Sequence, residues 1–231
     1  MRAGADGREV RGIPVIVGVD EAGRGPVIGP LVVCGVAVSP RRLKTIEQMG
    51  LKDSKLLTPK RREELAVRLK NICRHELAVV SPEEIDARLA EGGTLNGIEV
   101  ECFAKVIEAL RPKAAYLDAC DVNAERFGMN VRTRLGFEVE VVSRHNADKD
   151  YPIVSAASIL AKVHRDALVK KISETVGEDV GSGYPHDPIT IKFLKSYYAK
   201  NGEMPPFVRK SWKTTSAVIS DCLQSRLTGF L

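Results

Sequence analysis

The feature that most constrains the fold is the segment from Val15 to Pro26, in which a run of β-branched residues leads directly into two carboxylates. The apolar run ending at Val19 predicts a buried strand. Asp20 and Glu21 then place negative charge at the end of that strand, where burial is unfavourable without a cation or strong hydrogen-bond donors. The segment therefore predicts a sheet with charged groups at one edge. A strand–turn–strand hairpin with solvated acids fits this segment equally well.

A glycine-rich loop, Gly23-Arg24-Gly25, follows the two carboxylates. Because glycine has no Cβ, backbone amides of such a loop can approach a ligand closely. Carboxylates that face this loop suggest metal chemistry on a phosphate. The glycines and prolines of the stretch also suit an ordinary turn.

The composition is typical of a globular protein, with 231 residues, 44% hydrophobic and 28% charged. The five cysteines are scattered and none has C-x-x-C spacing, so we expect reduced thiols in an intracellular, cytoplasmic protein rather than a zinc site or disulfides. The sequence has no apolar run long enough for a membrane span, and we expect no membrane partner. Residues 1–12 are expected to form a flexible leader.

The positive charge is concentrated near the C-terminus. Residues 188–231 contain seven Lys or Arg and two acids, so their formal charge of +5 equals that of the whole chain. A basic segment beside a carboxylate cluster is expected of an enzyme that binds a polyanion, although solvated helix faces also contain many lysines. We expect a basic helical C-terminal region at 188–231 after a catalytic domain at 13–187.

The order of the predicted elements indicates an α/β fold. Apolar runs predict strands near 14–20, 31–38, 75–80, 114–118 and 137–142. Caps, helical periodicity and helix-ending glycine or proline predict helices near 58–73, 94–110, 123–135 and 151–176, with a short helix after Ser81. Hairpin strands come first and crossover helices later, as in a mixed sheet flanked by helices.

Two further carboxylates occupy positions where ligands bind in such folds. Asp118 ends the apolar run from Ala114, and the carboxyl ends of parallel strands form binding edges. Asp148 directly precedes the longest predicted helix. Asp118 could instead be a loop acid or helix cap. Asp148 could complement a helix dipole, with Asp150 as the better cap.

The longest predicted helix has a polar stripe. Its members are spaced by three or four residues and are Ser155, Ser158, Lys162 and Arg165. Hydroxyls and cations in one row beside Asp148 suit contacts to a phosphodiester backbone. The alternative is an ordinary solvated helix face.

Several motifs together resemble the ribonuclease HII family (type 2 ribonuclease H), most closely its archaeal branch. They are Val19–Leu31 with its Asp-Glu-Ala-Gly-Arg-Gly core, Lys52-Asp-Ser-Lys55, Tyr116-Leu-Asp-Ala119, Ala147-Asp148, Ser155–Lys162 and Gly181–Pro188. The resemblance extends over nearly the whole chain from Val15 onward. It implies a ribonuclease H-like mixed sheet flanked by helices, with a helical C-terminal region.

The resemblance also implies roles for individual residues. Asp20, Glu21, Asp118 and Asp148 match the family's catalytic, metal-binding carboxylates, which would hold Mg²⁺ or Mn²⁺, as two divalent cations when substrate is bound. The loop Gly23-Arg24-Gly25 matches the one that recognises a ribose 2′-hydroxyl. Tyr184 matches a tyrosine that stacks on the next deoxyribose. Candidate phosphate contacts are Lys52, Ser54, Lys55, Ser158, Lys162, Arg165 and Lys213, for which surface solvation is the alternative.

The expected activity is metal-dependent endonucleolytic cleavage of the RNA strand of RNA–DNA hybrids. The enzyme would also nick duplex DNA 5′ to an embedded ribonucleotide and leave 5′-phosphate and 3′-hydroxyl ends. Its partners would be these nucleic acids; we expect a monomer, with Phe230-Leu231 as a weak indication of a sliding-clamp contact. The rivals are a non-catalytic hybrid-binding module on the same fold and a metal-dependent phosphatase for small molecules, which would not need an extended phosphate track.

Overall fold

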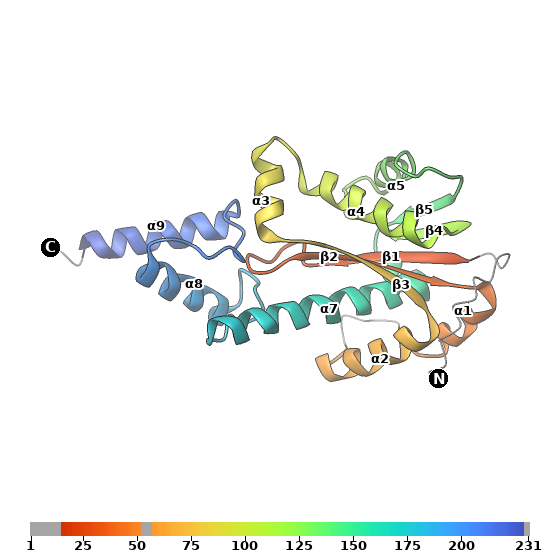
Figure 1. Ribbon diagram of the computed structural model, residues 1–231, viewed down its shortest axis with the longest axis horizontal. Helices are drawn as coiled ribbons and strands as arrows, with labels where there is room; N and C mark the ends of the chain where they lie inside the picture. The colour runs from red at the N-terminus through yellow and green to blue at the C-terminus, as the bar shows by residue number, and fades with distance from the viewer. Residues whose placement is uncertain (1–14, 52–56, 229–231) are drawn as a thin grey trace, which may run out of the picture.

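A computed structural model describes residues 15–51 and 57–228 of the chain (Figure 1). The strands are β1 (Ile16–Ala22), β2 (Leu31–Val38), β3 (Arg74–Val80), β4 (Ala114–Asp118) and β5 (Glu140–Arg144). The helices of the first two thirds of the chain are α1 (Pro40–Glu47), α2 (Pro59–Ile72), α3 (Pro82–Ala90), α4 (Leu95–Leu110), α5 (Ala124–Arg132) and α6 (Ala147–Asp150). Three more follow, α7 (Pro152–Val176), α8 (Pro188–Asn201) and α9 (Lys213–Thr228).

The five strands form one mixed sheet in the order β3-β2-β1-β4-β5. The first three strands pair antiparallel, as a hairpin of β1 and β2 extended by β3. β4 and β5 then add in parallel on the other side of β1, each reached through a helix. The predicted change from hairpin strands to crossover connections is therefore confirmed, and it makes β1 the strand where the two halves meet.

Helices cover both faces of the sheet (Figure 1). α4 and α5 pack on one face around Phe103 and Phe127, whereas α7, α1 and α2 pack on the other. α7 approaches β1 so closely that a Cβ on Gly18 would lie 2.4 Å from the backbone of Ile153. Only glycine fits at such a contact. This close packing fixes α7 directly beside the strand that carries Asp20.

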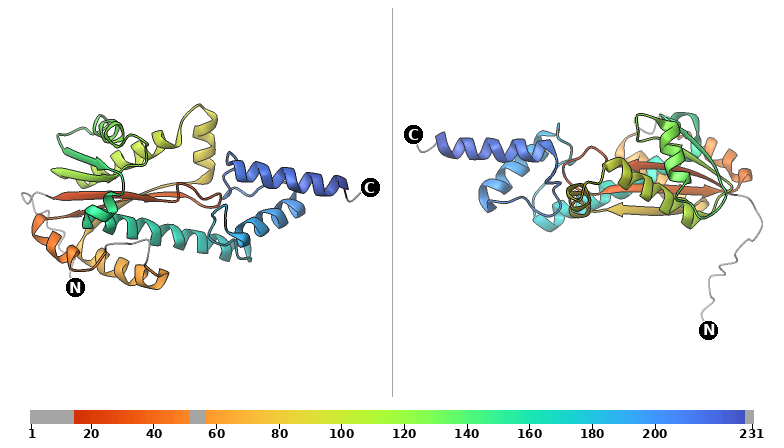
Figure 2. Two further views of the ribbon diagram at one scale, coloured as in Figure 1. Left: turned by 180° about the vertical axis from the view of Figure 1, so that it is seen from behind. Right: turned by 90° about the horizontal axis from the view of Figure 1, so that it is seen from above.

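α8 and α9 extend from one end of the sheet, beyond the last turns of α7 (Figure 2). A third apolar cluster joins them to α7 and to the loop after β1, with Phe193, Leu194 and Val208 buried in it. Ile28 and Val208 also form an isolated antiparallel bridge. The helical C-terminal region is thereby held directly against the Gly23–Pro30 loop.

Several local details differ from the expectations. Two short helices, α1 and α6, were not expected, although Ser39-Pro40 is a start signal of the kind recognised at Thr58-Pro59. The last strand begins at Glu140 rather than 137. Asp150 is not the cap of α7, since it lies in α6 and the N-cap position is Tyr151.

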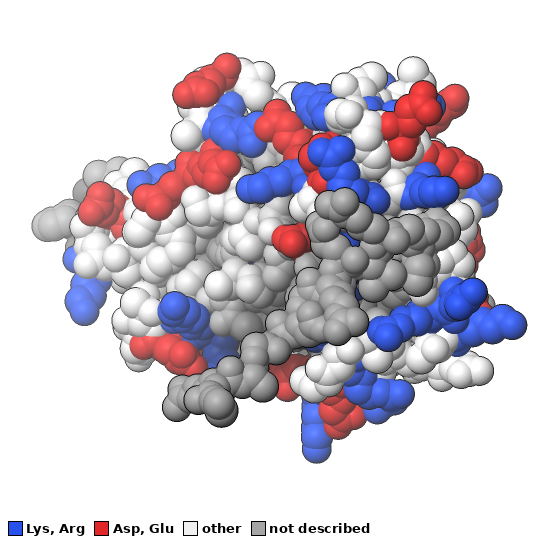
Figure 3. Space-filling model, turned by 45° about the vertical axis from the view of Figure 1, so that its right-hand side comes forward, with Lys and Arg blue, Asp and Glu red and all other residues white. Residues whose placement is uncertain are grey.

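The surface charges of one face and the state of the cysteines can be described directly. Lys and Arg are mixed with Asp and Glu on the face shown in Figure 3. All five cysteines are free thiols, and three of them are buried. Among the helices that the structure describes, none combines the length and apolar character needed to cross a bilayer.

Candidate functional site

Three carboxylates converge where β1, β4 and α6 meet. β1 and β4 are parallel neighbours, so Asp20 and Asp118 lie at adjacent positions of the two strands. Asp148 reaches the same point from α6, which follows β5. Ligand oxygens of the three residues all lie within 4.8 Å of one another. Ala147 N donates to Asp118 Oδ1 at 3.1 Å and so links α6 to the end of β4.

The cluster concentrates negative charge in a buried place. Asp20 and Asp148 are each 5% exposed. Burial raises the pKa of Asp20 well above its usual range, and the charge of Glu21 raises it further. A hydrogen bond from Ser158 opposes this rise, and Lys162 Nζ donates to Ser158 Oγ at 2.7 Å. Close buried carboxylates are tolerated best with a bound cation, and hard carboxylate oxygens suit Mg²⁺ or Mn²⁺.

Glu21 belongs to a second cluster, on the opposite face of β1. Side chains alternate along a strand, so Asp20 points toward α7 and Glu21 toward α4. Ligand atoms of Glu21, Glu99 and Cys120 lie within 4.8 Å of one another. Burial, followed by the charge of Glu21, raises the pKa of the Cys120 thiol well above its usual range.

The Gly-Arg-Gly loop lies beside this second cluster. Arg24 forms an ion pair with Glu99, which is fully buried, and donates to Asn96 Oδ1 at 2.6 Å. Gly23 has a φ of +95°, and a Cβ there would lie 2.4 Å from Pro30 O. The backbone therefore requires glycine at this position. The Arg24 side chain is committed to α4, so the loop presents its backbone rather than this guanidinium.

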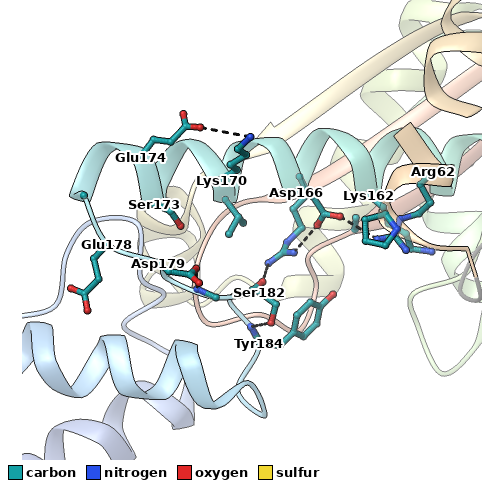
Figure 4. Close-up of a pocket in the computed structure, with 16 residues that line it drawn as sticks. Arg62, Lys162, Asp166, Lys170, Ser173, Glu174, Glu178, Asp179, Ser182 and Tyr184 are labelled. Atoms are coloured by element: carbon teal, nitrogen blue, oxygen red, sulfur yellow. Dashed lines mark hydrogen bonds and ion pairs between the residues drawn. The ribbon is translucent and has the colours of Figure 1, made fainter. Parts of the chain in front are cut away.

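Tyr184 lies next to the same loop. A Cβ on Gly25 would be 3.9 Å from the Tyr184 ring, and the Arg165 guanidinium lies 5.1 Å from the ring centroid. Tyr184 also lines a groove of about 940 Å³, whose lining includes Ala22 at the end of β1. Figure 4 shows α7 as one wall of this groove, with Lys162 on it, and the Ser182–Tyr184 loop opposite. The groove adjoins the three-aspartate cluster rather than containing it.

The predicted phosphate contacts have different surroundings. Ser158 is fully buried, and Arg165, only 3% exposed, donates to the carbonyls of Ile28 and Ser182. Lys162 is half-buried, whereas Lys213 is exposed at the start of α9. The stripe on α7 is thus not an ordinary solvated face. The remaining candidates, Lys52, Ser54 and Lys55, lie outside the described residues.

The sequence interpretation missed three residues around the Gly-Arg-Gly loop: Glu99, Cys120 and Arg209. Glu99 interrupts the apolar stripe of α4, four residues after Leu95 and four before Phe103, and this was a detectable signal. Arg209 is fully buried, but it stands in a stretch without regular periodicity. Nothing in its local sequence distinguishes it from the neighbouring exposed Lys210.

The family described as Ribonuclease HII matches residues 17–215 of the chain. A ribonuclease HII from Methanocella arvoryzae is 63% identical over 215 residues, which are 93% of this chain and 96% of the relative.

Solved structures of ribonucleases H2 and HII are similar to this chain in both fold and sequence. The ribonuclease H2 from Pyrococcus horikoshii has a TM-score of 0.84 at 41% identity, with 91% of this chain and 99% of that chain covered. The ribonuclease HII of a PCNA complex from Archaeoglobus fulgidus has a TM-score of 0.80 at 45% identity, with 88% and 96% covered. These matches extend over the sheet, the carboxylate cluster and most of the C-terminal region, and the chain therefore belongs to the ribonuclease HII family.

Proposed function

We propose that Asp20, Glu21, Asp118 and Asp148 are the catalytic carboxylates and hold divalent cations, Mg²⁺ or Mn²⁺. As a member of its family the chain is an endonucleolytic hydrolase acting on RNA–DNA hybrids and embedded ribonucleotides. The observation that carries the assignment is the convergence of Asp20, Asp118 and Asp148 within 4.8 Å. Glu21, at the next position of β1, belongs to the cluster on the other face of the strand, but its side chain also hydrogen-bonds that of Asp20 and would extend the oxygen set toward the loop.

The donor set fits hard divalent cations, because it consists of carboxylate oxygens with no imidazole in the group. Such cations, when bound, lower the pKa of water and neutralise charge on a phosphodiester. The chain's own part is positional. β1 and β4 hold two carboxylates in register, and the hydrogen bonds from Lys162 to Ser158 and from Ser158 to Asp20 orient one of them. Cleavage would leave 5′-phosphate and 3′-hydroxyl ends.

The substrate would be recognised on the groove side of this centre. Gly23-Arg24-Gly25 offers backbone groups at the end of β1, and a 2′-hydroxyl, which both donates and accepts, is what separates RNA from DNA. Tyr184, packed against Gly25, would stack on the following deoxyribose. Lys52, Ser54, Lys55, Ser158, Lys162, Arg165 and Lys213 remain candidate phosphate contacts. The division into a catalytic domain (13–187) and a basic C-terminal region (188–231), and a cytoplasmic location, belong to the same proposal.

One experiment separates this function from its rivals. A labelled duplex with a single ribonucleotide is incubated with the protein, with and without Mg²⁺, beside the same duplex made wholly of DNA. We expect a cut 5′ to the ribonucleotide only in the presence of Mg²⁺, and no cut in the DNA control. Binding without cleavage would support the non-catalytic module, and hydrolysis of small phosphate esters alone would support a phosphatase.

A second proposal concerns the C-terminus. The Archaeoglobus fulgidus ribonuclease HII was solved in a complex with PCNA, and this chain ends in Phe230-Leu231, outside the described residues. We propose that this ending contacts a sliding clamp. Removal of residues 229–231 should abolish co-elution with a purified archaeal clamp while cleavage of a short duplex persists. Unchanged co-elution would place the contact elsewhere.

A further inference from the structure

We propose that Arg209 is a positioning residue for the Gly-Arg-Gly loop, and that the segment Arg209–Trp212 sets the loop's ability to distinguish ribose from deoxyribose. The inference rests on the proposed function of that loop. It assigns the C-terminal region a part in sugar specificity in addition to binding phosphate.

All three guanidinium nitrogens of Arg209 donate hydrogen bonds to carbonyl oxygens of the loop after β1. Nη2 donates to Gly23 O at 2.5 Å and to Gly29 O at 3.0 Å. Nη1 donates to Arg24 O at 3.0 Å, and Nε donates to Gly29 O at 3.2 Å. The indole of Trp212 completes the set, because its Nε1 donates to Gly25 O at 3.3 Å. Every carbonyl of Gly23-Arg24-Gly25 thus accepts a hydrogen bond from this one segment.

These contacts determine where the loop's amides point. In a trans peptide the C=O of one residue and the N–H of the next point in opposite directions. Because the carbonyls of Gly23 and Arg24 face Arg209, the N–H groups of Arg24 and Gly25 face away from it. Two consecutive donors are therefore turned outward together, beside Tyr184. A sugar hydroxyl can accept hydrogen bonds from donors arranged in this way.

The segment that carries Arg209 is itself held on several sides. Trp212 stacks on the guanidinium, whose carbon lies 4.7 Å from the ring centroid. Arg209 N donates to Val27 O at 2.9 Å, and Thr215 Oγ1 donates to Arg209 O at 2.7 Å. Asp86 of α3 accepts from the backbone amides of the two residues that follow Arg209, at 2.6 and 3.1 Å. The segment Arg209–Trp212 is therefore fixed by contacts to the loop, to α3 and to α9, as a positioning role requires.

The chemistry of the site argues against a simple surface cation. Arg209 is fully buried, and its direct hydrogen-bond acceptors in the described structure are carbonyl oxygens. Burial, followed by the charge of Arg165, lowers the pKa of Arg209 to about 9. A buried cation is tolerated only when its donors are all matched, and the five-donor fork of arginine matches several carbonyls where lysine cannot. Its guanidinium therefore serves the carbonyls of the loop rather than the molecular surface.

The test compares affinities for two duplexes of one sequence, one with a single ribonucleotide and one all DNA. Binding is measured in Ca²⁺, so that cleavage does not interfere, for the wild type, Arg209→Lys and Trp212→Phe. Arg209→Lys should lose about tenfold or more of the preference for the ribonucleotide, with affinity for DNA unchanged. Trp212→Phe, which keeps the stack but loses one donor, should lose a smaller part. Leu194→Ala is the matched control, since Leu194 is buried in the same C-terminal apolar cluster but its side chain has no group that could hydrogen-bond to the loop.

The outcomes are distinguishable. If the wild type shows no preference for the ribonucleotide duplex, the proposed function of the loop fails. If the wild type shows it and folded Arg209→Lys and Trp212→Phe keep it, only the present inference is overturned. An equal loss of affinity for both duplexes would also overturn it, because it would make Arg209 a general binding residue. A comparable loss of preference in Leu194→Ala would overturn it as well, because any destabilisation of this region would then have the same effect.

Discussion

Asp20 and Glu21 are consecutive, yet strand alternation directs one toward α7 and the other toward α4. At the residue scale, this alternation places the two neighbouring carboxylates in different clusters. Asp20, Asp118 and Asp148 were each recognisable by their place at the end of a strand or before a helix, and the structure brings them together. The partner of Arg24 was not predicted, because Glu99 is separated from it by 75 positions and only folding brings α4 to the loop.

Tyr184 provides a test at this scale. Tyr184→Ala should lose more activity on a lone embedded ribonucleotide than on a continuous RNA–DNA hybrid, because only the former offers a deoxyribose next to the ribose. The loss should correspond to ~1–3 kcal/mol, by analogy with base–aromatic stacking. Initial cleavage rates on the two substrates measure it, with Tyr184→Phe as the control that keeps the ring. Equal slowing on both substrates would make Tyr184 a structural residue that supports Arg165.

Lys213 tests the phosphate contacts. Lys213→Ala should lower the slope of log affinity against log salt by about one, because one fewer counterion is released on binding. A titration of duplex binding over a range of salt concentrations measures the slope. Lys44→Ala is the control, since Lys44 is exposed on α1, at the end of the sheet remote from α8 and α9 (Figure 1). Identical slopes for all three proteins would reduce Lys213 to a solvated surface residue.

At the scale of elements, caps and periodicity predicted most helices within a few residues. Thr58, Ser81 and Asn123 each cap the helix expected to begin there, accepting from the backbone three residues on. The orientation of α7 was harder to predict. In its polar stripe Ser158 and Arg165 are buried and hydrogen-bond to Asp20 of β1 and to Ile28 O, whereas Lys162 is half-buried. A pattern of polar residues does not show whether their partners are water or protein.

The loop before α8 gives a pH-dependent prediction. Hydrogen bonds from Ser182, first that of its hydroxyl, lower the pKa of Asp187 to about 2, and Asp187 also caps α8 through Ile189 N at 2.9 Å. Because the folded pKa lies below the unfolded one, the carboxylate stabilises the fold fully above about pH 4 and loses this effect as pH falls through about 2.

Asp187→Asn should therefore reduce the free energy of unfolding by about 1 kcal/mol at pH 7, because the hydrogen bonds from Ser182 would no longer be made to a charged group, and the difference should vanish toward pH 2. Urea unfolding at several pH values measures it. Ser182→Ala is the matched control. It should reduce the change in the free energy of unfolding between pH 7 and pH 2 without abolishing it. A difference that stays constant between pH 7 and pH 2 would contradict the account.

At the scale of the whole molecule, the site is assembled from distant parts of the chain. The α/β class, the hairpin and the helical C-terminal region followed from local patterns, and the mixed sheet confirms them. The hydrogen bonds from Arg209 to the Gly-Arg-Gly loop could not be predicted from local patterns, since Gly23 and Arg209 are 186 positions apart. Such contacts depend on the packing of α8 and α9 against α7, which no local pattern specifies.

The central claim is that the converging carboxylates hold the cations that support cleavage. The variant Asp118→Asn tests this claim most directly. The variant should keep its circular dichroism spectrum and be at least as stable without metal, because one of three close negative charges is removed. Its cleavage of a duplex with one ribonucleotide in Mg²⁺ should fall by at least about a hundredfold, since loss of a ligand should exceed the effect of losing an outer-shell partner. Near-normal turnover by the folded variant would remove Asp118 from the metal site and contradict the account.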